Sequence, residues 1–179
     1  GDPNLSTMFT GARGTGKTAL LSLLSETALE HDWIAANVSA MPGMLEDIIE
    51  RTKEAADSYL SQPHARINGV QIGPVGIDWT YAQEAQGNWR TRMNGIFKQL
   101  EKHDIGLLIT IDEVTVDLEE MLQFASVYQH FVREGKKVAL LMAGLPYKVS
   151  ALLRNDSVSF LRRSQYHQLG RITDVRSEE

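Results

Sequence analysis

The segment from Gly11 to Thr18, which reads Gly-Ala-Arg-Gly-Thr-Gly-Lys-Thr, constrains the fold of this chain more than any other stretch. It matches the pattern G-x-x-x-x-G-K-S/T of a phosphate-binding loop. An apolar run over 5–10 predicts a strand before the loop, and apolar residues at helical spacing predict a helix after it. Glycines let backbone N–H groups turn inward around phosphate oxygens, and the helix N-terminus adds its dipole. The sequence therefore predicts a nucleotide site near its beginning.

This loop supplies the residues that we expect to touch a nucleotide: Gly11, Ala12, Arg13, Gly14, Thr15, Gly16, Lys17, Thr18 and Ala19. Lys17 is a candidate catalytic residue because its ammonium group can bridge the β- and γ-phosphates, and Thr18 can place its hydroxyl on Mg²⁺. Arg13 and Thr15 occupy variable positions of such loops, where they face solvent or support the loop. A glycine-rich turn that only caps a helix is the other interpretation.

A second half of the site is predicted at the end of the most apolar segment, 107–111, which has the composition of a central strand. Asp112 and Glu113 follow it, at the edge where parallel α/β sheets hold ligands. Asp112 would bind the Mg²⁺ held by Thr18, directly or through water, and Glu113 would polarise a water for in-line attack on the γ-phosphate. These acids could instead cap the next helix. The pair favours hydrolysis, and the lack of an Asn-Lys-x-Asp sequence favours ATP over GTP.

Composition limits the classes of protein to which the chain can belong. Its 179 residues, 42% apolar and 23% charged, predict one packed domain. The net charge of −5 argues against nucleic-acid binding by the domain as a whole, although the segment 154–176 is locally basic. Without cysteine there is no disulfide or thiolate-zinc site, and no apolar run reaches the ~18 residues of a bilayer span. We expect a cytoplasmic protein without membrane contact.

The order of apolar runs and amphipathic stretches predicts an α/β fold with parallel strands joined by crossover helices. Further strands are expected at 33–38, 107–111, 138–143 and 167–172. Helices are expected from about Pro42, over 89–100, over 118–132 and over 146–153. Glycines and prolines break the pattern over about 62–87, which we interpret as an insertion with a hairpin-like stretch at 70–79.

The loop, the Asp112–Glu113 pair and this order of elements resemble the AAA+ ATPases, an ASCE-type branch of the P-loop ATPases. The runs Leu141–Pro146 and Phe160–Arg163 are similar to those of its initiator-like and STAND-type regulatory branch. The resemblance implies a three-layer α/β/α sandwich with a five-stranded parallel sheet in the order 5-1-4-3-2. It also implies that 1–179 is a single core domain with the 62–87 insertion, and that a helical lid and other domains belong to a longer protein.

The resemblance also assigns roles outside the two motifs. In such families an arginine reaches the γ-phosphate of a neighbouring subunit, and Arg162 or Arg163 matches its position; a basic helix end is the other interpretation. Both are therefore candidate catalytic residues. The chain departs from the family pattern at Ala143-Gly144, where a polar sensor residue is usual. Asn37 occupies a position where some relatives keep a polar residue that restrains the catalytic Glu, or it makes only local hydrogen bonds.

These observations favour Mg-ATP binding and hydrolysis in a nucleotide-switch module of a larger regulatory or remodelling protein. ATP and Mg²⁺ would be its cofactors. The resemblance implies self-association through the ATP site, with a DNA or protein partner bound by other domains. One alternative is a scaffold that binds ATP or ADP with negligible hydrolysis, and another is the ATPase core of a DNA-handling, initiator-like protein. A small-molecule kinase is disfavoured by Glu113, because transfer to a hydroxyl needs no water-activating acid.

Overall fold

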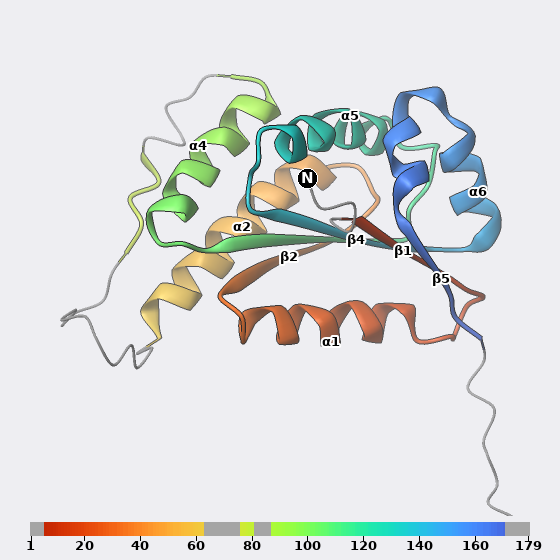
Figure 1. The fold of residues 1–179 in the computed structure, drawn as a ribbon, viewed down its shortest axis with the longest axis horizontal. Helices are drawn as coiled ribbons and strands as arrows, with labels where there is room; N and C mark the ends of the chain where they lie inside the picture. Colours follow the sequence, from red (N-terminus) through yellow and green to blue (C-terminus); the bar gives the residue numbers. More distant parts are fainter. Residues whose placement is uncertain (1–5, 63–75, 81–86, 171–179) are drawn as a thin grey trace, which may run out of the picture.

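A single parallel sheet organises the chain, for which the computed structural model describes residues 6–62, 76–80 and 87–170 (Figure 1). Its five strands are β1 (Ser6–Thr10), β2 (Trp33–Ser39), β3 (Gly106–Asp112), β4 (Val138–Gly144) and β5 (Gln165–Gln168). Every pair of neighbours is parallel, and the strands lie in the order β2-β3-β4-β1-β5. The predicted order 5-1-4-3-2 is therefore confirmed.

Helices cover both faces of this sheet, as Figure 1 shows. One face carries α1 (Lys17–Leu29). The opposite face carries α2 (Met44–Ser61), α4 (Trp89–Lys102), α5 (Glu119–Arg133) and α6 (Pro146–Arg154). A 3-10 helix, η1 (Asp156–Arg163), follows α6 and leads into β5. The predicted three-layer α/β/α sandwich is confirmed.

The larger hydrophobic core lies between the sheet and the four helices of one layer. Leu107, Ile109 and Ile111 of β3 belong to it, because alternate side chains of a strand point to the same face. Strand β3 is buried along nearly its whole length, since it has a strand on each side and helices over both faces. A smaller core of Phe9, Leu21 and Ala143 lies on the α1 side. The central strand thus delivers Asp112 to the sheet edge from a rigid support.

Helix α2 begins at Met44, so the expectation that Pro42 stands in its first turn is wrong. Gly43 precedes the helix in the left-handed conformation, with φ of 91°. The carboxylate of Glu120, in the first turn of α5, accepts the N–H groups of Gly43 at 2.7 Å and Leu45 at 2.9 Å. A distant acid therefore caps the helix and fixes its start, which no local signal in the sequence reveals.

The end of the chain also differs from the prediction. The last strand is Gln165–Gln168 rather than 167–172, and the sequence predicts no helix at 156–163. All four strand residues are exposed, so no apolar pattern marks them, and pairing with β1 positions them. The predicted insertion and its hairpin-like stretch at 70–79 lie mostly outside the described residues; the described part, 76–79, contains no strand.

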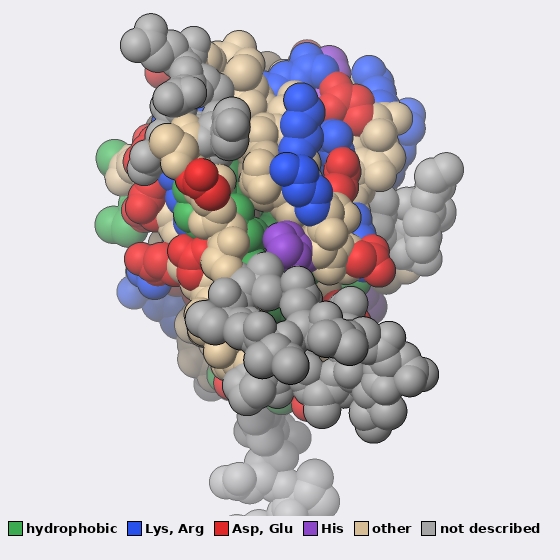
Figure 2. All heavy atoms as spheres, turned by 90° about the vertical axis from the view of Figure 1, so that its left-hand side faces the viewer, with side chains coloured by type: hydrophobic (Ala, Val, Ile, Leu, Met, Phe, Trp, Pro, Cys, Tyr) green, Lys and Arg blue, Asp and Glu red, His purple; other side chains and the backbone are tan. Residues whose placement is uncertain are grey.

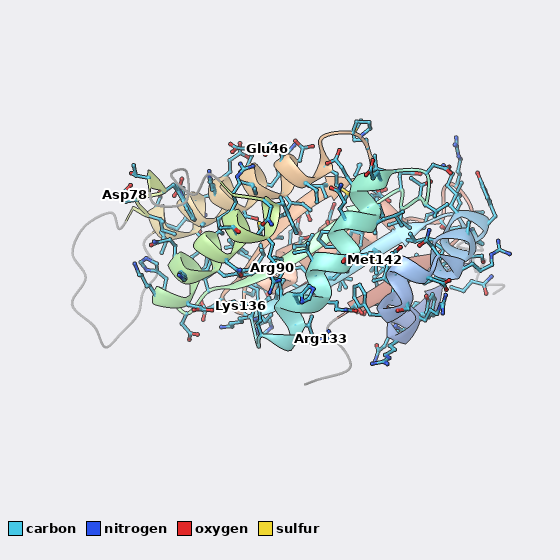
Figure 3. The ribbon with its side chains drawn as sticks, turned by 90° about the horizontal axis from the view of Figure 1, so that it is seen from above. Glu46, Asp78, Arg90, Arg133, Lys136 and Met142 are labelled. Atoms are coloured by element: carbon cyan, nitrogen blue, oxygen red, sulfur yellow. The ribbon has the colours of Figure 1, made fainter. Side chains whose placement is uncertain are left out.

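Ion pairs tie together the helices of the four-helix layer. Arg92 of α4 donates two hydrogen bonds of 2.7 Å to Glu46 of α2, and these bonds hold the pKa of Glu46 below its usual range. Arg90 pairs with Glu134, which follows α5; Figure 3 labels Glu46 and Arg90 on this layer.

In Figure 2, which shows the left-hand side of Figure 1, basic and acidic side chains are intermixed. The described part of that side is therefore not uniformly basic.

Close packing at the start of β3 generates a stability prediction. A Cβ atom on Gly106 would lie 2.3 to 2.7 Å from three ring atoms of Trp33. We expect Gly106→Ala to lower the free energy of unfolding by about 1–3 kcal/mol, because the indole ring has to move. Gly170→Ala is the matched control, since its Cβ would meet no atom of the described residues within 4 Å. Chemical denaturation measures both, and equal stability of the two variants would contradict the packing argument.

Candidate nucleotide-binding site

The glycine-rich loop joins the end of β1 to the start of α1, as predicted. Gly14 and Gly16 have φ of 78° and 83°, a left-handed backbone in which glycine is the residue without strain. A Cβ on either would meet nothing within 4 Å, so the described protein atoms leave both positions open. Gly11 differs, because its Cβ would lie 2.6 Å from Thr15 Oγ1 and 3.0 Å from the Leu169 carbonyl oxygen. Backbone conformation therefore requires two of these glycines, and close packing requires the third.

Lys17 is buried inside the loop. Its ammonium group donates to the carbonyl oxygens of Gly11 at 2.7 Å and Ala12 at 2.8 Å. Thr15 donates its hydroxyl to the same Ala12 carbonyl at 2.8 Å, and Arg13 is exposed. Thr15 is thus a loop-supporting residue, one of the two roles considered for it. The lysine charge is therefore held inside the loop by the loop's own carbonyl groups.

Thr18 and Asp112 bring the two predicted halves of the site into contact. The Thr18 hydroxyl, in the first turn of α1, donates to Asp112 Oδ2 at 2.5 Å, although the residues are 94 positions apart. Hydroxyl and carboxylate oxygens are hard donors that suit Mg²⁺. In the described part of the chain no group of three or more His, Asp or Glu side chains is placed to hold a metal ion. A Mg²⁺ ion here would take its remaining ligands from phosphate oxygens and water.

Glu113 occupies a turn between two anchored residues. Its backbone has φ of 56°, which costs a non-glycine residue about 1–2 kcal/mol. The Asp112 carboxylate accepts the Glu113 N–H at 2.9 Å, and the next residue, Val114, donates its N–H to the Ala143 carbonyl at 3.0 Å. These bonds on both sides hold the strained backbone. Its carboxylate is exposed at the same sheet edge as Asp112.

The end of β4 carries no polar side chain, and the packing explains why. Gly144 is buried, and a Cβ there would lie 2.8 Å from Val114 Cγ2 and 3.2 Å from Val149 Cγ2. A polar sensor residue at this position would collide with both valines. The packing of β4 against Val114 therefore accounts for the glycine at position 144.

The two candidate arginines have different surroundings. Arg162 donates its Nε to the Leu153 carbonyl at 2.7 Å and pairs with Asp156 at 3.3 Å, which ties it to the end of α6. Arg163 is exposed and has no partner among the described residues. It precedes Gln165, which pairs with Thr7 early in β1, whereas the phosphate loop follows the end of β1. Neither arginine is therefore brought to the loop of its own chain.

Asn37 makes local hydrogen bonds, the second of the two roles considered for it. Its Oδ1 accepts the hydroxyl groups of Ser25 at 2.8 Å and Thr110 at 2.7 Å. It borders a cavity of about 240 Å³ between α1, the end of β2 and α2, which Thr18 and Asp112 also line. The sequence did not predict this cavity, because its walls come from separate elements and Arg51 of α2 belongs to no recognisable motif.

Three solved structures share this architecture. Cdc6p from Pyrobaculum aerophilum matches with a TM-score of 0.52 and 16% identity, over 90% of this chain and 38% of that chain. ORC1 from Aeropyrum pernix, in complex with DNA, has a TM-score of 0.50 and 14% identity over the same shares, 90% and 38%. A chain in the structure of Drosophila ORC bound to AT-rich DNA and Cdc6 has a TM-score of 0.50 and 10% identity, over 97% and 52%.

These similarities concern the fold. The chain has the fold of the AAA+ P-loop ATPases, as the resemblance in its sequence implies, and it spans 38% of the length of the first two matched chains. Neither a protein-family model nor a curated protein sequence matches it. Of the helices in 6–62, 76–80 and 87–170, none combines the length and apolar character that crossing a bilayer requires.

The contacts of Gly11 and Thr15 generate a second prediction. We expect Gly11→Ala to lower the free energy of unfolding by about 1–3 kcal/mol, because the new Cβ meets the Thr15 hydroxyl and the Leu169 carbonyl. In the double variant Gly11→Ala/Thr15→Ala part of this loss should disappear, since one of the two colliding groups is gone. A double-mutant cycle by denaturation measures the coupling. Strictly additive effects would show that the two residues do not collide.

Proposed function

We propose that this chain binds Mg-ATP and hydrolyses it, as the nucleotide-switch module of a larger regulatory or remodelling protein. The observation that carries the proposal is the hydrogen bond between Thr18 and Asp112, which joins the phosphate loop to the acidic end of β3. A glycine-rich turn that only capped a helix would need no such partner. The fold shared with AAA+ P-loop ATPases supports the same conclusion.

Each residue of the site has a role in the proposed reaction. The backbone amides of 11–19 bind the phosphates, and Lys17 contributes its charge to the β- and γ-phosphates. Thr18 and Asp112 would hold Mg²⁺, which neutralises charge on the phosphate oxygens when bound. Glu113 orients the attacking water and accepts its proton. Hydrogen bonds on both sides of Glu113 anchor its backbone directly after Asp112, which supports this role.

Assembly is part of the proposal. Arg163 is the better candidate for a cation supplied to a second copy, because Arg162 is held by Leu153 and Asp156. Such an arginine is worth ~10³ to 10⁵ in rate. We therefore propose slow turnover in the single chain and faster turnover when copies associate through the ATP site. A protein or DNA partner would be bound by other parts of a longer protein, and the cytoplasm is the proposed compartment.

For each of two alternative functions, one observation speaks in its favour. The buried Gly144, in place of a polar sensor, favours a scaffold that binds ATP or ADP and hydrolyses it negligibly. The matched ORC1 structure is a complex with DNA, which favours the ATPase core of a DNA-handling protein. The net charge of −5 does not support DNA binding by this domain alone.

Substitution of the two acids separates hydrolysis from binding. We expect Glu113→Gln to lower the rate of phosphate release by about 10²- to 10⁴-fold with ATP affinity nearly unchanged, because only the proton acceptor is lost. Asp112→Asn should weaken the Mg²⁺ dependence of ATP binding as well. Glu119→Gln is the matched control, an exposed acid in the first turn of α5. Phosphate release is measured at several protein concentrations, and ATP binding by calorimetry.

The measured rates and affinities distinguish the ATPase from the scaffold. Phosphate release that is the same in Glu113→Gln and in the unaltered chain would favour the scaffold. Absence of Mg-ATP binding to the folded chain would contradict the proposed function itself.

The role of Arg163 is tested by mixing variants. Arg163→Gln keeps an intact phosphate loop, and Lys17→Ala keeps an intact Arg163. We expect each alone to be nearly inactive and their mixture to regain turnover, because one copy supplies the arginine and the other the site. Arg162→Gln should instead lower thermal stability, since it removes the bond to the Leu153 carbonyl. A mixture no more active than its components would rule out Arg163 as a cation donated between copies.

A further inference from the structure

We propose that the cavity between α1, the end of β2 and α2 binds the inorganic phosphate released from ATP. This inference rests on the proposed function, because ATP hydrolysis supplies the ligand. The cavity has a volume of about 240 Å³, sufficient for a tetrahedral oxyanion. Thr18 and Asp112, the pair proposed to hold the metal, form part of its wall. A phosphate ion in it would therefore lie beside the metal-binding pair, on the β2 side.

Three exposed residues that line the cavity carry hydrogen-bond donors with no acceptor in the described part of the chain, so these donors are free to exchange water for an anion. The Oδ1 atom of Asn37 accepts from Ser25 and Thr110, so its amide N–H groups are left for another acceptor. The Ser39 hydroxyl and the Arg51 guanidinium group have no partner there either. A phosphate ion offers four acceptor oxygens, and a guanidinium group binds two of them side by side.

The charges around the cavity predict when the anion binds. Arg51 is its cation, and Asp47, one turn earlier on α2, and Asp112 are its acids. With both acids ionised these side chains sum to a net negative charge, which disfavours an anion. Mg²⁺ on Thr18 and Asp112 would make the sum positive. Phosphate binding should therefore depend on Mg²⁺. A phosphate released while Mg²⁺ is bound reaches the cavity when the net charge around it is positive.

The same chemistry would suit a phosphate group carried by some other small molecule. The two sources differ in what they require. A product phosphate needs the metal held in place with the nucleoside diphosphate, whereas the phosphate group of an independent ligand needs only the cavity. The observations favour the product, because the metal-binding pair itself forms the wall and the side chains alone carry no net positive charge.

Titration of inorganic phosphate into the chain tests the proposal. Binding is followed by calorimetry with Mg-ADP present, with ADP and EDTA present, and with no addition. We expect measurable binding only with Mg-ADP. Arg51→Gln should weaken it by about tenfold or more, because a charge-assisted bond is lost, while Mg-ADP affinity stays the same. Arg133→Gln is the matched control, an exposed arginine in the last turn of α5 that is not among the residues lining the cavity.

Ser39→Ala is a second variant, which removes one donor without changing charge and guards against misfolding of Arg51→Gln. A loss of phosphate affinity in both variants, with Mg-ADP affinity retained, supports the proposal. Equal phosphate affinity in Arg51→Gln and Arg133→Gln would overturn it, as would phosphate binding of equal strength without Mg-ADP. Mg-ADP binding without any phosphate binding would also overturn it, and would leave the proposed ATP site standing. Failure to bind Mg-ADP is instead the failure of the proposed function.

Discussion

The hydrogen bond between Thr18 and Asp112 is the contact on which the organisation of this site depends. It forms only because β1 and β3 are parallel and end at the same edge, with β4 between them. The loop that follows β1 curves into α1, and the first turn of α1 reaches across β4 toward the end of β3. A sheet with another strand order would separate the lysine-bearing loop from the acids. The order of the strands is thus the physical origin of the site.

Packing around this contact limits the chemistry. Val114 follows the acid pair, is fully buried, and lies against Gly144 at the end of β4. Its backbone bond to Ala143 helps to hold Glu113 in a left-handed turn, and its side chain leaves no room for a Cβ atom on Gly144. Stabilisation that a polar sensor would give must therefore come from elsewhere. This constraint links the proposed slow turnover to the proposed need for an arginine from a second copy.

The two sides of α1 serve different purposes. Toward β2 it presents Ser25, which bonds to Asn37, and hydroxyl-bearing residues that border the cavity. Toward β1 and β4 it packs Leu20, Leu21 and Leu24 against the smaller core. One helix therefore anchors the phosphate loop through apolar contacts and also lines the cavity beside Thr18 and Asp112.

The sequence by itself determined the phosphate loop, the buried central strand, the acid pair and the parallel α/β class, because each depends on local spacing or on a run of apolar residues. The tertiary structure decided what local patterns do not encode. The start of α2 is set by Glu120 from another helix, and β5 is set by pairing of an exposed, polar segment with β1. Contacts also distinguish two adjacent residues of the same type: Arg162 donates a hydrogen bond within the chain, whereas Arg163 has no partner among the described residues. The cavity near Arg51 exists because α1, β2, α2 and β3 meet, and only a folded chain brings their side chains to one place.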